Sequence, residues 1–231
     1  MHPEYILFSP LIEQAIELAA QWHDNTYRKS RWRDPAFDLP EEAVLRVPAM
    51  AHVTAVAMTV QRAGWDDETV AAAFLHDVLE DFNRFGQTLL HEQLLRLMGE
   101  AVTALVDIVS EQKFDDEGQW RSWRDRKEGY VAQLRSGAPR ATAISLADKL
   151  HNLWSMNEGL LRGLDIFNDG PNHRGLSAGP EEQFWFYNAV ISASLGFSDP
   201  RLEPMRVRLA QEIDHFRTVA GLPQGDPDGL K

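Results

Sequence analysis

The sequence predicts an all-α protein folded as a single-domain helical bundle, and three observations lead to this prediction. Apolar residues recur with helical spacing through most of the 231 residues. Residues that favour helix starts and stops bound these stretches, and no run alternates apolar and polar residues strongly enough to predict a strand. Apolar residues make up 44% of the chain, which is enough to bury a substantial core.

The helices predicted in the first third of the chain cover residues 10–22, 49–64 and 66–81. Ser9 suits an N-cap and Pro10 the first helical position. Gly64 suits the end of the second helix, because glycine adopts the left-handed backbone of a C-terminal stop. Asp66 or Asp67 is expected to cap the third.

Between the first two helices lie a basic cluster and a loop. The cluster, "YRKSRWR", holds four cations: Arg28, Lys29, Arg31 and Arg33. Prolines are expected to keep 34–48 as a loop with at most one short turn. Because the chain has 35 acidic and 23 basic residues, a net charge of −12, the cluster fits a small anion or plain solvent better than nucleic acid.

The rest of the chain follows the same helical pattern. Further helices are predicted at 91–112 (as one helix or two), 117–137, 139–159, 180–196 and 199–221. A polar loop spans roughly 163–180. We therefore expect one domain over 1–221 and a flexible tail at 222–231.

Composition also narrows the location and the chemistry. The chain has no cysteine, which excludes disulfides and thiolate metal sites and fits a cytoplasmic protein. Its N-terminus lacks the basic flank and apolar run of a signal peptide, and no stretch approaches a membrane span. We expect no membrane and no nucleic-acid partner, and leave a homo-oligomer open.

Charged residues occur inside two stretches that otherwise look buried. His76 and Asp77 lie in 66–81, which is apolar on nearly every side, and Asp148 lies in 139–159. An unpaired buried carboxylate would cost several kcal/mol, so each acid needs a cation. Lys149 is not expected to pair with Asp148, because neighbours along a helix point in different directions.

Two interior acids without two interior bases suggest a divalent metal. His52, near the start of another apolar helix, completes a candidate ligand set of His52, His76, Asp77 and Asp148. Imidazole and carboxylate together suit Mn²⁺, Fe²⁺, Zn²⁺ or Co²⁺. Taken singly, each residue also fits a core histidine, a core His-Asp pair or an ion-pair partner; only the combination favours the metal.

Further polar residues lie about one helical turn from these ligands. Glu80 and Asp81 follow His76 and Asp77 by four residues, so on a helix they would share a side and could orient or deprotonate water near the metal. They could equally form the solvated end of the helix. His151 and Asn152, three and four residues past Asp148, can also face the site.

The order of His52, "FLHDVLED" and "SLADKLHN" resembles the HD phosphohydrolase superfamily, and more narrowly the hydrolase domain of RelA/SpoT-type proteins and the stand-alone small alarmone hydrolases. The stretch "AIELAAQWHDNTYRK" is similar to the opening helix of that family. The resemblance covers about 10–157. The stretches "FNDG" and "PEEQFWFYNAV" look like the C-terminal helix of stand-alone members, and the C-terminal helices are expected at about 181–219.

The resemblance implies an all-α fold with one bound metal, usually Mn²⁺, held by His52, His76, Asp77 and Asp148. Two further roles are implied. Glu80 and Asp81 match the family's catalytic acids, and the substrate contacts match Arg28, Lys29 and Asn152. The implied reaction removes the 3′-pyrophosphate from guanosine tetra- or pentaphosphate.

Other functions remain open at this stage. His52 is followed by Val53 where the family has proline, Asp24-Asn25 replaces its Gly-Gln pair, and the segment between Lys29 and His52 is longer. The alternatives are a nucleotidase or NADPH phosphatase of the same superfamily, or a non-catalytic helical binding module.

Overall fold

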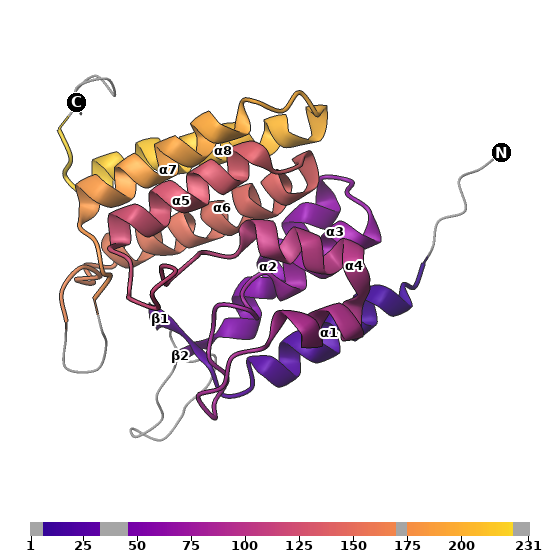
Figure 1. Ribbon diagram of the computed structural model, residues 1–231. Coiled ribbons are helices and arrows are strands. Elements are labelled where there is room, and N and C mark those ends of the chain that lie inside the picture. Colours follow the sequence, from indigo (N-terminus) through magenta and orange to yellow (C-terminus); the bar gives the residue numbers. More distant parts are fainter. Residues whose placement is uncertain (1–6, 33–45, 170–174, 224–231) are drawn as a thin grey trace, which may run out of the picture.

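The computed structural model describes residues 7–32, 46–169 and 175–223 as a bundle of helices in two layers (Figure 1). The elements, in chain order, are α1 (Pro10–Trp22), β1 (Tyr27–Trp32), β2 (Arg46–Pro48), α2 (Ala49–Arg62), α3 (Asp67–Leu75), α4 (His91–Val109), α5 (Trp123–Ser136), α6 (Pro139–Leu161), α7 (Pro180–Ser194), a short 3₁₀ turn (Pro200–Leu202) and α8 (Glu203–Val219). The all-α prediction is confirmed. The predicted tail falls largely on 224–231, outside the described residues.

Several helix boundaries follow from the expected capping residues. The Ser9 hydroxyl accepts from the Ile12 N–H, and an Asp66 carboxylate oxygen accepts from the Thr69 N–H. Gly64 has φ 82° after α2, as its stop role requires. In α4, Gly99 has φ 78° and ψ 175°, which no helix continues through, and His91 at one end lies 2.8 Å from Asp107 near the other, so the alternative of one helix or two resolves as two helical stretches that meet at a sharp kink.

Three predictions about secondary structure are wrong. α5 begins at Trp123 rather than near 117, because Ser122 caps it. Strands do occur: β1 and β2 pair as an antiparallel ribbon between Tyr27 and Pro48. The third error concerns α3, which ends at Leu75, so His76 and Asp77 do not lie inside a helix.

The side chain of His76 accounts for the early end of α3. Its Nδ1 lies 2.8 Å from the Ala73 carbonyl oxygen, which would accept the Asp77 N–H if the helix continued. The chain instead tightens, with the Val78 N–H donating to the Leu75 oxygen at 3.1 Å and the Asp81 N–H to the Asp77 oxygen at 2.9 Å. His76 and the acids after it therefore lie on a tight turn at the end of α3.

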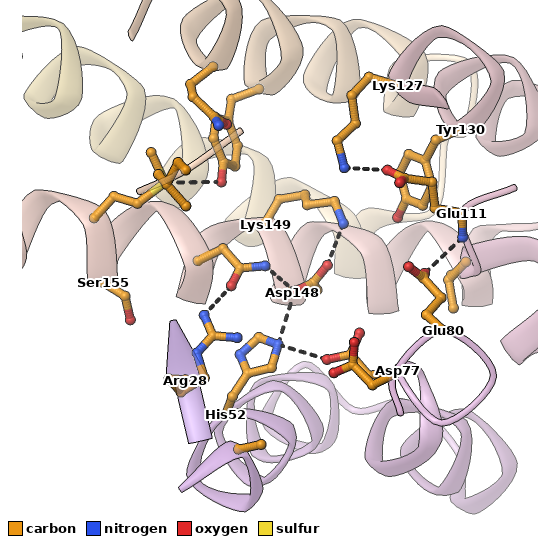
Figure 2. A pocket seen from close by; sticks show the side chains of 18 of the residues that line it. Arg28, His52, Asp77, Glu80, Glu111, Lys127, Tyr130, Asp148, Lys149 and Ser155 are labelled. Carbon is orange, nitrogen blue, oxygen red and sulfur yellow. Dashed lines mark hydrogen bonds and ion pairs between the residues drawn. The ribbon is translucent and has the colours of Figure 1, made fainter. Parts of the chain in front are cut away.

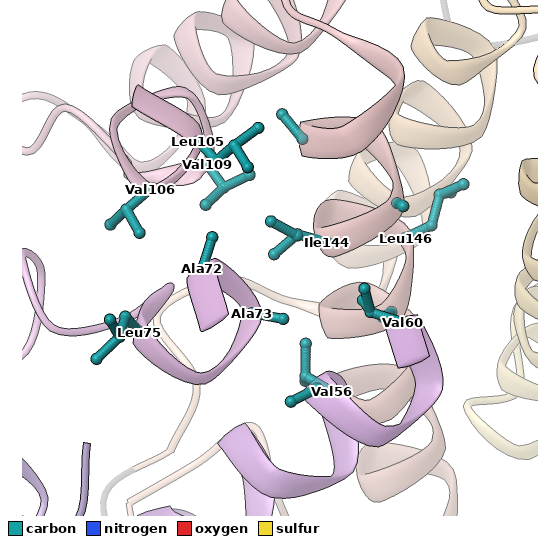
Figure 3. Packing of buried hydrophobic residues seen from close by; sticks show 14 of the residues in the cluster. Val56, Val60, Ala72, Ala73, Leu75, Leu105, Val106, Val109, Ile144 and Leu146 are labelled. Carbon is teal, nitrogen blue, oxygen red and sulfur yellow. The ribbon is translucent and has the colours of Figure 1, made fainter. Parts of the chain in front are cut away.

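The core is centred on α3 and α6. The alanines of α3 are fully buried, and their small size lets α2, α4 and α6 pack closely around it (Figure 3). Val56 and Val60 of α2 and Ile144 of α6 lie on its sides. Burial of each such aliphatic side chain contributes about 1.5–3 kcal/mol. This packing fixes the ends of α2 and α3 against the middle of α6, where the predicted ligands lie.

None of the helices that the structure describes combines the length and the apolar character needed to cross a bilayer.

Candidate metal centre

Four predicted ligands meet where α2, the end of α3 and α6 come together, and Figure 2 shows three of them, His52, Asp77 and Asp148. The Nε2 atom of His52 lies 3.2 Å from Nε2 of His76 and 3.2 Å from Oδ1 of Asp148. Ligand atoms of these three residues all lie within 4.8 Å of one another, and the three residues are buried. The Asp77 carboxylate lies beside them, 3.3 Å from His76 Nε2 and 3.6 Å from His52 Nε2.

The two imidazoles have opposite electrostatic surroundings. Burial, and then the positive charge of Arg28, lower the pKa of His52 to about 4, so its ring is neutral. Burial also opposes the charged form of His76, but Asp77 and then Asp148 outweigh it and raise its pKa to about 9. A proton on His76 therefore offsets part of the charge of the two acids.

Both carboxylates are held ionised. Burial disfavours their charged forms, but Lys149 and the two histidines keep the pKa of Asp148 well below its usual value. His76 and then His52 likewise lower the pKa of Asp77. The expectation that Lys149 would not reach Asp148 is wrong: its Nζ forms an ion pair with Asp148 Oδ2. That leaves Oδ1 facing the histidines and the Asn152 amide.

This donor set fits a divalent cation. Two imidazole nitrogens and two ionised carboxylates converge, and the only positive charge among them is the proton on His76, which a cation could replace. His52, His76, Asp77 and Asp148 are the residues that would hold the ion.

Glu80 lies next to this group on the same turn. Its Oε1 accepts the Glu111 N–H at 2.8 Å, and the Lys113 Nζ donates to its backbone oxygen at 2.6 Å. Burial, and then the charge of Asp77, raise the pKa of Glu80 to about 7. A carboxyl group with that pKa exchanges protons readily at neutral pH. Asp81 is exposed and lines the opening beside it.

The predicted substrate contacts are brought to the same place only in part. Arg28, on β1, donates to the Asn152 Oδ1, and the Asn152 amide nitrogen donates in turn to Asp148. The strand ribbon that the sequence did not predict thus carries Arg28 to α6. The side chain of Lys29 lies outside the described residues, as does most of the long segment that follows it.

A cavity of about 310 Å³ opens over the centre. One end is charged: besides the predicted residues it is lined by Glu111, Lys127 and Lys149. The other end is largely apolar or aromatic, and its lining includes Met156, Ile166, Leu176 and Tyr187. The cavity could therefore take a ligand with an anionic group at one end and a flat or apolar group at the other.

Sequence reasoning missed the charged lining that surrounds Glu80. Glu111 forms ion pairs with both Arg126 and Lys127, and Lys127 is partly buried and lines the cavity. The detectable signal was "SEQK" directly after an apolar helix, together with the "RDRK" run of α5. His23 was also missed: it is buried, and neither ring nitrogen has a hydrogen-bond partner among the described residues.

Comparison with known proteins gives consistent results. The HD domain family matches residues 37–162. A GTP pyrophosphokinase of Streptomyces coelicolor is 33% identical over 148 residues, which are 63% of this chain and 14% of that protein. A guanosine-3′,5′-bis(diphosphate) 3′-pyrophosphohydrolase of Aquifex aeolicus is 28% identical over 152 residues, 64% of this chain and 18% of that protein. The chain thus spans less than a fifth of the length of these curated relatives.

Among solved structures, a metazoan ortholog of SpoT that hydrolyses ppGpp has a similar fold. The two superpose with a TM-score of 0.59 at 23% sequence identity, over 94% of this chain and 98% of the other. This likeness extends the similarity of fold beyond the matched family region to the C-terminal helices.

Proposed function

The chain belongs to the HD domain family, and on that premise we propose that it is a metal-dependent phosphohydrolase that removes the 3′-pyrophosphate from guanosine tetraphosphate or pentaphosphate. The observation that carries the proposal is the placement of Glu80, with a pKa of about 7, directly beside four converging cation ligands. The substrate comes from the relatives, two of which are named for guanine nucleotide pyrophosphoryl chemistry.

We assign Mn²⁺ to the centre formed by His52, His76, Asp77 and Asp148, with Fe²⁺, Zn²⁺ and Co²⁺ as alternatives. A divalent ion there would supply Lewis-acid chemistry, polarising a phosphoryl oxygen and acidifying water. The residues around it then divide the remaining tasks between moving protons and holding the substrate.

Glu80 moves the proton. In its ionised form it accepts a proton from the attacking water, and in its protonated form it can deliver one to the leaving oxygen of the ribose. Its hydrogen bond from the Glu111 N–H fixes one carboxylate oxygen, and the other, 3.7 Å from the Lys113 Nζ, is the one that would face the attacking water. Asp81, exposed at the mouth of the cavity, is placed to position that water.

The cations hold the anionic groups. Arg28 is fixed by Asn152, and Lys127 and Lys149, which pair with Glu111 and Asp148, line the same cavity, so phosphates entering it can contact three cationic side chains. The apolar end, with Met156 and Tyr187, is suited to the base. We assign Lys29 to the same phosphates on the resemblance alone.

The net charge of −12 argues against nucleic acid as the substrate. A cytoplasmic location and a homo-oligomer stay predictions.

The direct test is incubation of the Mn²⁺-loaded protein with guanosine tetraphosphate, with pyrophosphate and guanosine diphosphate measured as products. Both should appear in equal amounts. The proposed substrate would be contradicted if the protein released inorganic phosphate from NADPH or a nucleoside monophosphate but did not cleave guanosine tetraphosphate. That result would favour a phosphatase of the same family. No turnover of any nucleotide would favour a binding module.

Cation affinity should rise with pH. Because the pKa of His76 is raised to about 9, the metal-free protein carries a proton there at neutral pH, and the cation must displace it. We expect the apparent Mn²⁺ affinity to increase about tenfold per pH unit between about pH 7 and about pH 9, and then to level off. Calorimetry in buffers of different ionisation enthalpy should count about one released proton. A flat profile would show that His76 is not a ligand.

A further inference from the structure

A second histidine lies behind His52, on the side away from the other ligands. The Nδ1 atom of His52 is 2.8 Å from the Nδ1 atom of His151, and the ring centroids are 4.8 Å apart. His52 is 1% exposed, so solvent does not compete for this contact. Its opposite ring nitrogen, Nε2, is the one that faces His76 and Asp148.

The contact restricts where each ring can carry its proton. Two ring nitrogens at 2.8 Å need one proton between them, because two N–H groups or two lone pairs would repel. A cation at the centre needs the lone pair of His52 Nε2, so the proton of His52 must lie on Nδ1. His52 then donates to His151, and His151 accepts at Nδ1 and carries its own proton on Nε2.

We propose that His151 is a positioning residue that holds His52 in the Nδ1–H tautomer and so prepares its Nε2 lone pair for the metal. Metal-ligating histidines generally donate their second ring N–H to a fixed acceptor, which sets both tautomer and ring orientation. In the described structure Nδ1 of His151 is the acceptor that lies at hydrogen-bond distance from Nδ1 of His52. The inference rests on the proposed metal centre, but not on the proposed substrate.

His151 acts through His52 rather than on the substrate. It does not line the 310 Å³ cavity, whereas it does line a separate cavity of about 140 Å³ on the other face of α6. Trp154 borders the same small cavity, with its ring centroid 5.7 Å from that of His151. A substitution at His151 can therefore change the metal centre without altering the wall that a nucleotide would touch.

Two substitutions separate acceptor chemistry from packing. His151→Leu removes the acceptor and fills its place with an apolar side chain of similar size. His151→Asn instead places an acceptor oxygen at about the position of Nδ1. The Mn²⁺ dissociation constant should rise by about 10–100-fold in His151→Leu, the usual effect of losing such a partner. In His151→Asn it should return close to that of the parent. His91→Leu is the matched control, since His91 is exposed, pairs with Asp107 and does not line the cavity over the centre.

A spectroscopic measurement tests the parent protein without any substitution. In ¹⁵N-histidine-labelled, Zn²⁺-loaded protein, long-range ¹H–¹⁵N correlations distinguish the two imidazole tautomers. We expect His52 as the Nδ1–H form and His151 as the Nε2–H form. His52 found as the Nε2–H form, or unchanged Mn²⁺ affinity in folded His151→Leu, would overturn the inference. If the leucine variant does not fold, the NMR result and the asparagine variant decide.

The outcome can be separated from that of the proposed function by running the hydrolysis assay in parallel. Weakened Mn²⁺ binding in His151→Leu, in a protein that does not cleave guanosine tetraphosphate, keeps the inference and removes the proposed substrate. If the parent protein cleaves guanosine tetraphosphate and His151→Leu binds Mn²⁺ with unchanged affinity, the inference about His151 is wrong but the proposed function stands. A parent that binds no divalent metal removes both.

Discussion

Replacing Asp148 with asparagine is expected to abolish both Mn²⁺ binding and hydrolysis. Asp148 supplies one of the two negative charges of the centre, and its Oδ1 is the carboxylate oxygen within 3.2 Å of His52 Nε2. The substitution also leaves the Lys149 ammonium group without its ion-pair partner; both side chains are largely buried. Breaking a buried pair on one side costs about 3–5 kcal/mol, so the metal-free variant should also unfold at a lower temperature.

The measurements are calorimetric titration with Mn²⁺, the pyrophosphate assay and thermal unfolding followed by circular dichroism. Asp214→Asn is the control, because Asp214 is an exposed carboxylate on α8 that pairs with Arg217. It should change stability by less than about 1 kcal/mol and leave binding intact. Normal Mn²⁺ affinity in Asp148→Asn would show that the cation lies elsewhere.

Replacing Glu80 with glutamine should separate catalysis from metal binding. Glutamine keeps an oxygen that can accept the Glu111 N–H but cannot exchange a proton. We expect kcat to fall by about 10²–10⁴-fold, the usual contribution of a general acid or base, with Mn²⁺ affinity little changed. The residual activity should lose the pH dependence near 7 that follows from the raised pKa of Glu80.

Glu128→Gln is the matched control, since Glu128 is a half-exposed glutamate of α5 that pairs with Arg124. Its kcat and pH profile should match those of the parent. If Glu80→Gln keeps the parental kcat, another group, with Asp81 as the nearest acid on the turn, must move the proton. If Glu80→Gln instead loses Mn²⁺, Glu80 belongs to the metal centre.

The sequence predicted most helices because their ends depend on local chemistry. Ser9, Gly64 and Asp66 act within a few residues of themselves, so their effect is visible in the chain. The end of α3 was not visible. It depends on the His76 side chain, which lies at hydrogen-bond distance from the Ala73 carbonyl oxygen. The apolar residues that continue to Leu79 gave no reason to expect this contact.

The candidate metal ligands were predictable because buried charge is costly and therefore conspicuous in an apolar stretch. The residues that pair with these ligands were harder to predict. Lys149 reaches Asp148 although the two are adjacent, because a long flexible side chain can turn back where a short one cannot. Glu111 and Lys127 lie on separate segments, and only the tertiary fold brings them to Glu80. The β1–β2 ribbon was missed because its two strands are short and irregularly paired.

The most direct test is an anomalous diffraction map from a crystal of the protein grown or soaked with Mn²⁺. The account predicts one strong peak bounded by Nε2 of His52, Nε2 of His76 and the carboxylates of Asp77 and Asp148, with Nδ1 of His52 still bonded to His151. A peak at any other place, or its absence from a crystal with Mn²⁺ bound elsewhere on the protein, would contradict the assignment of these residues as a metal centre.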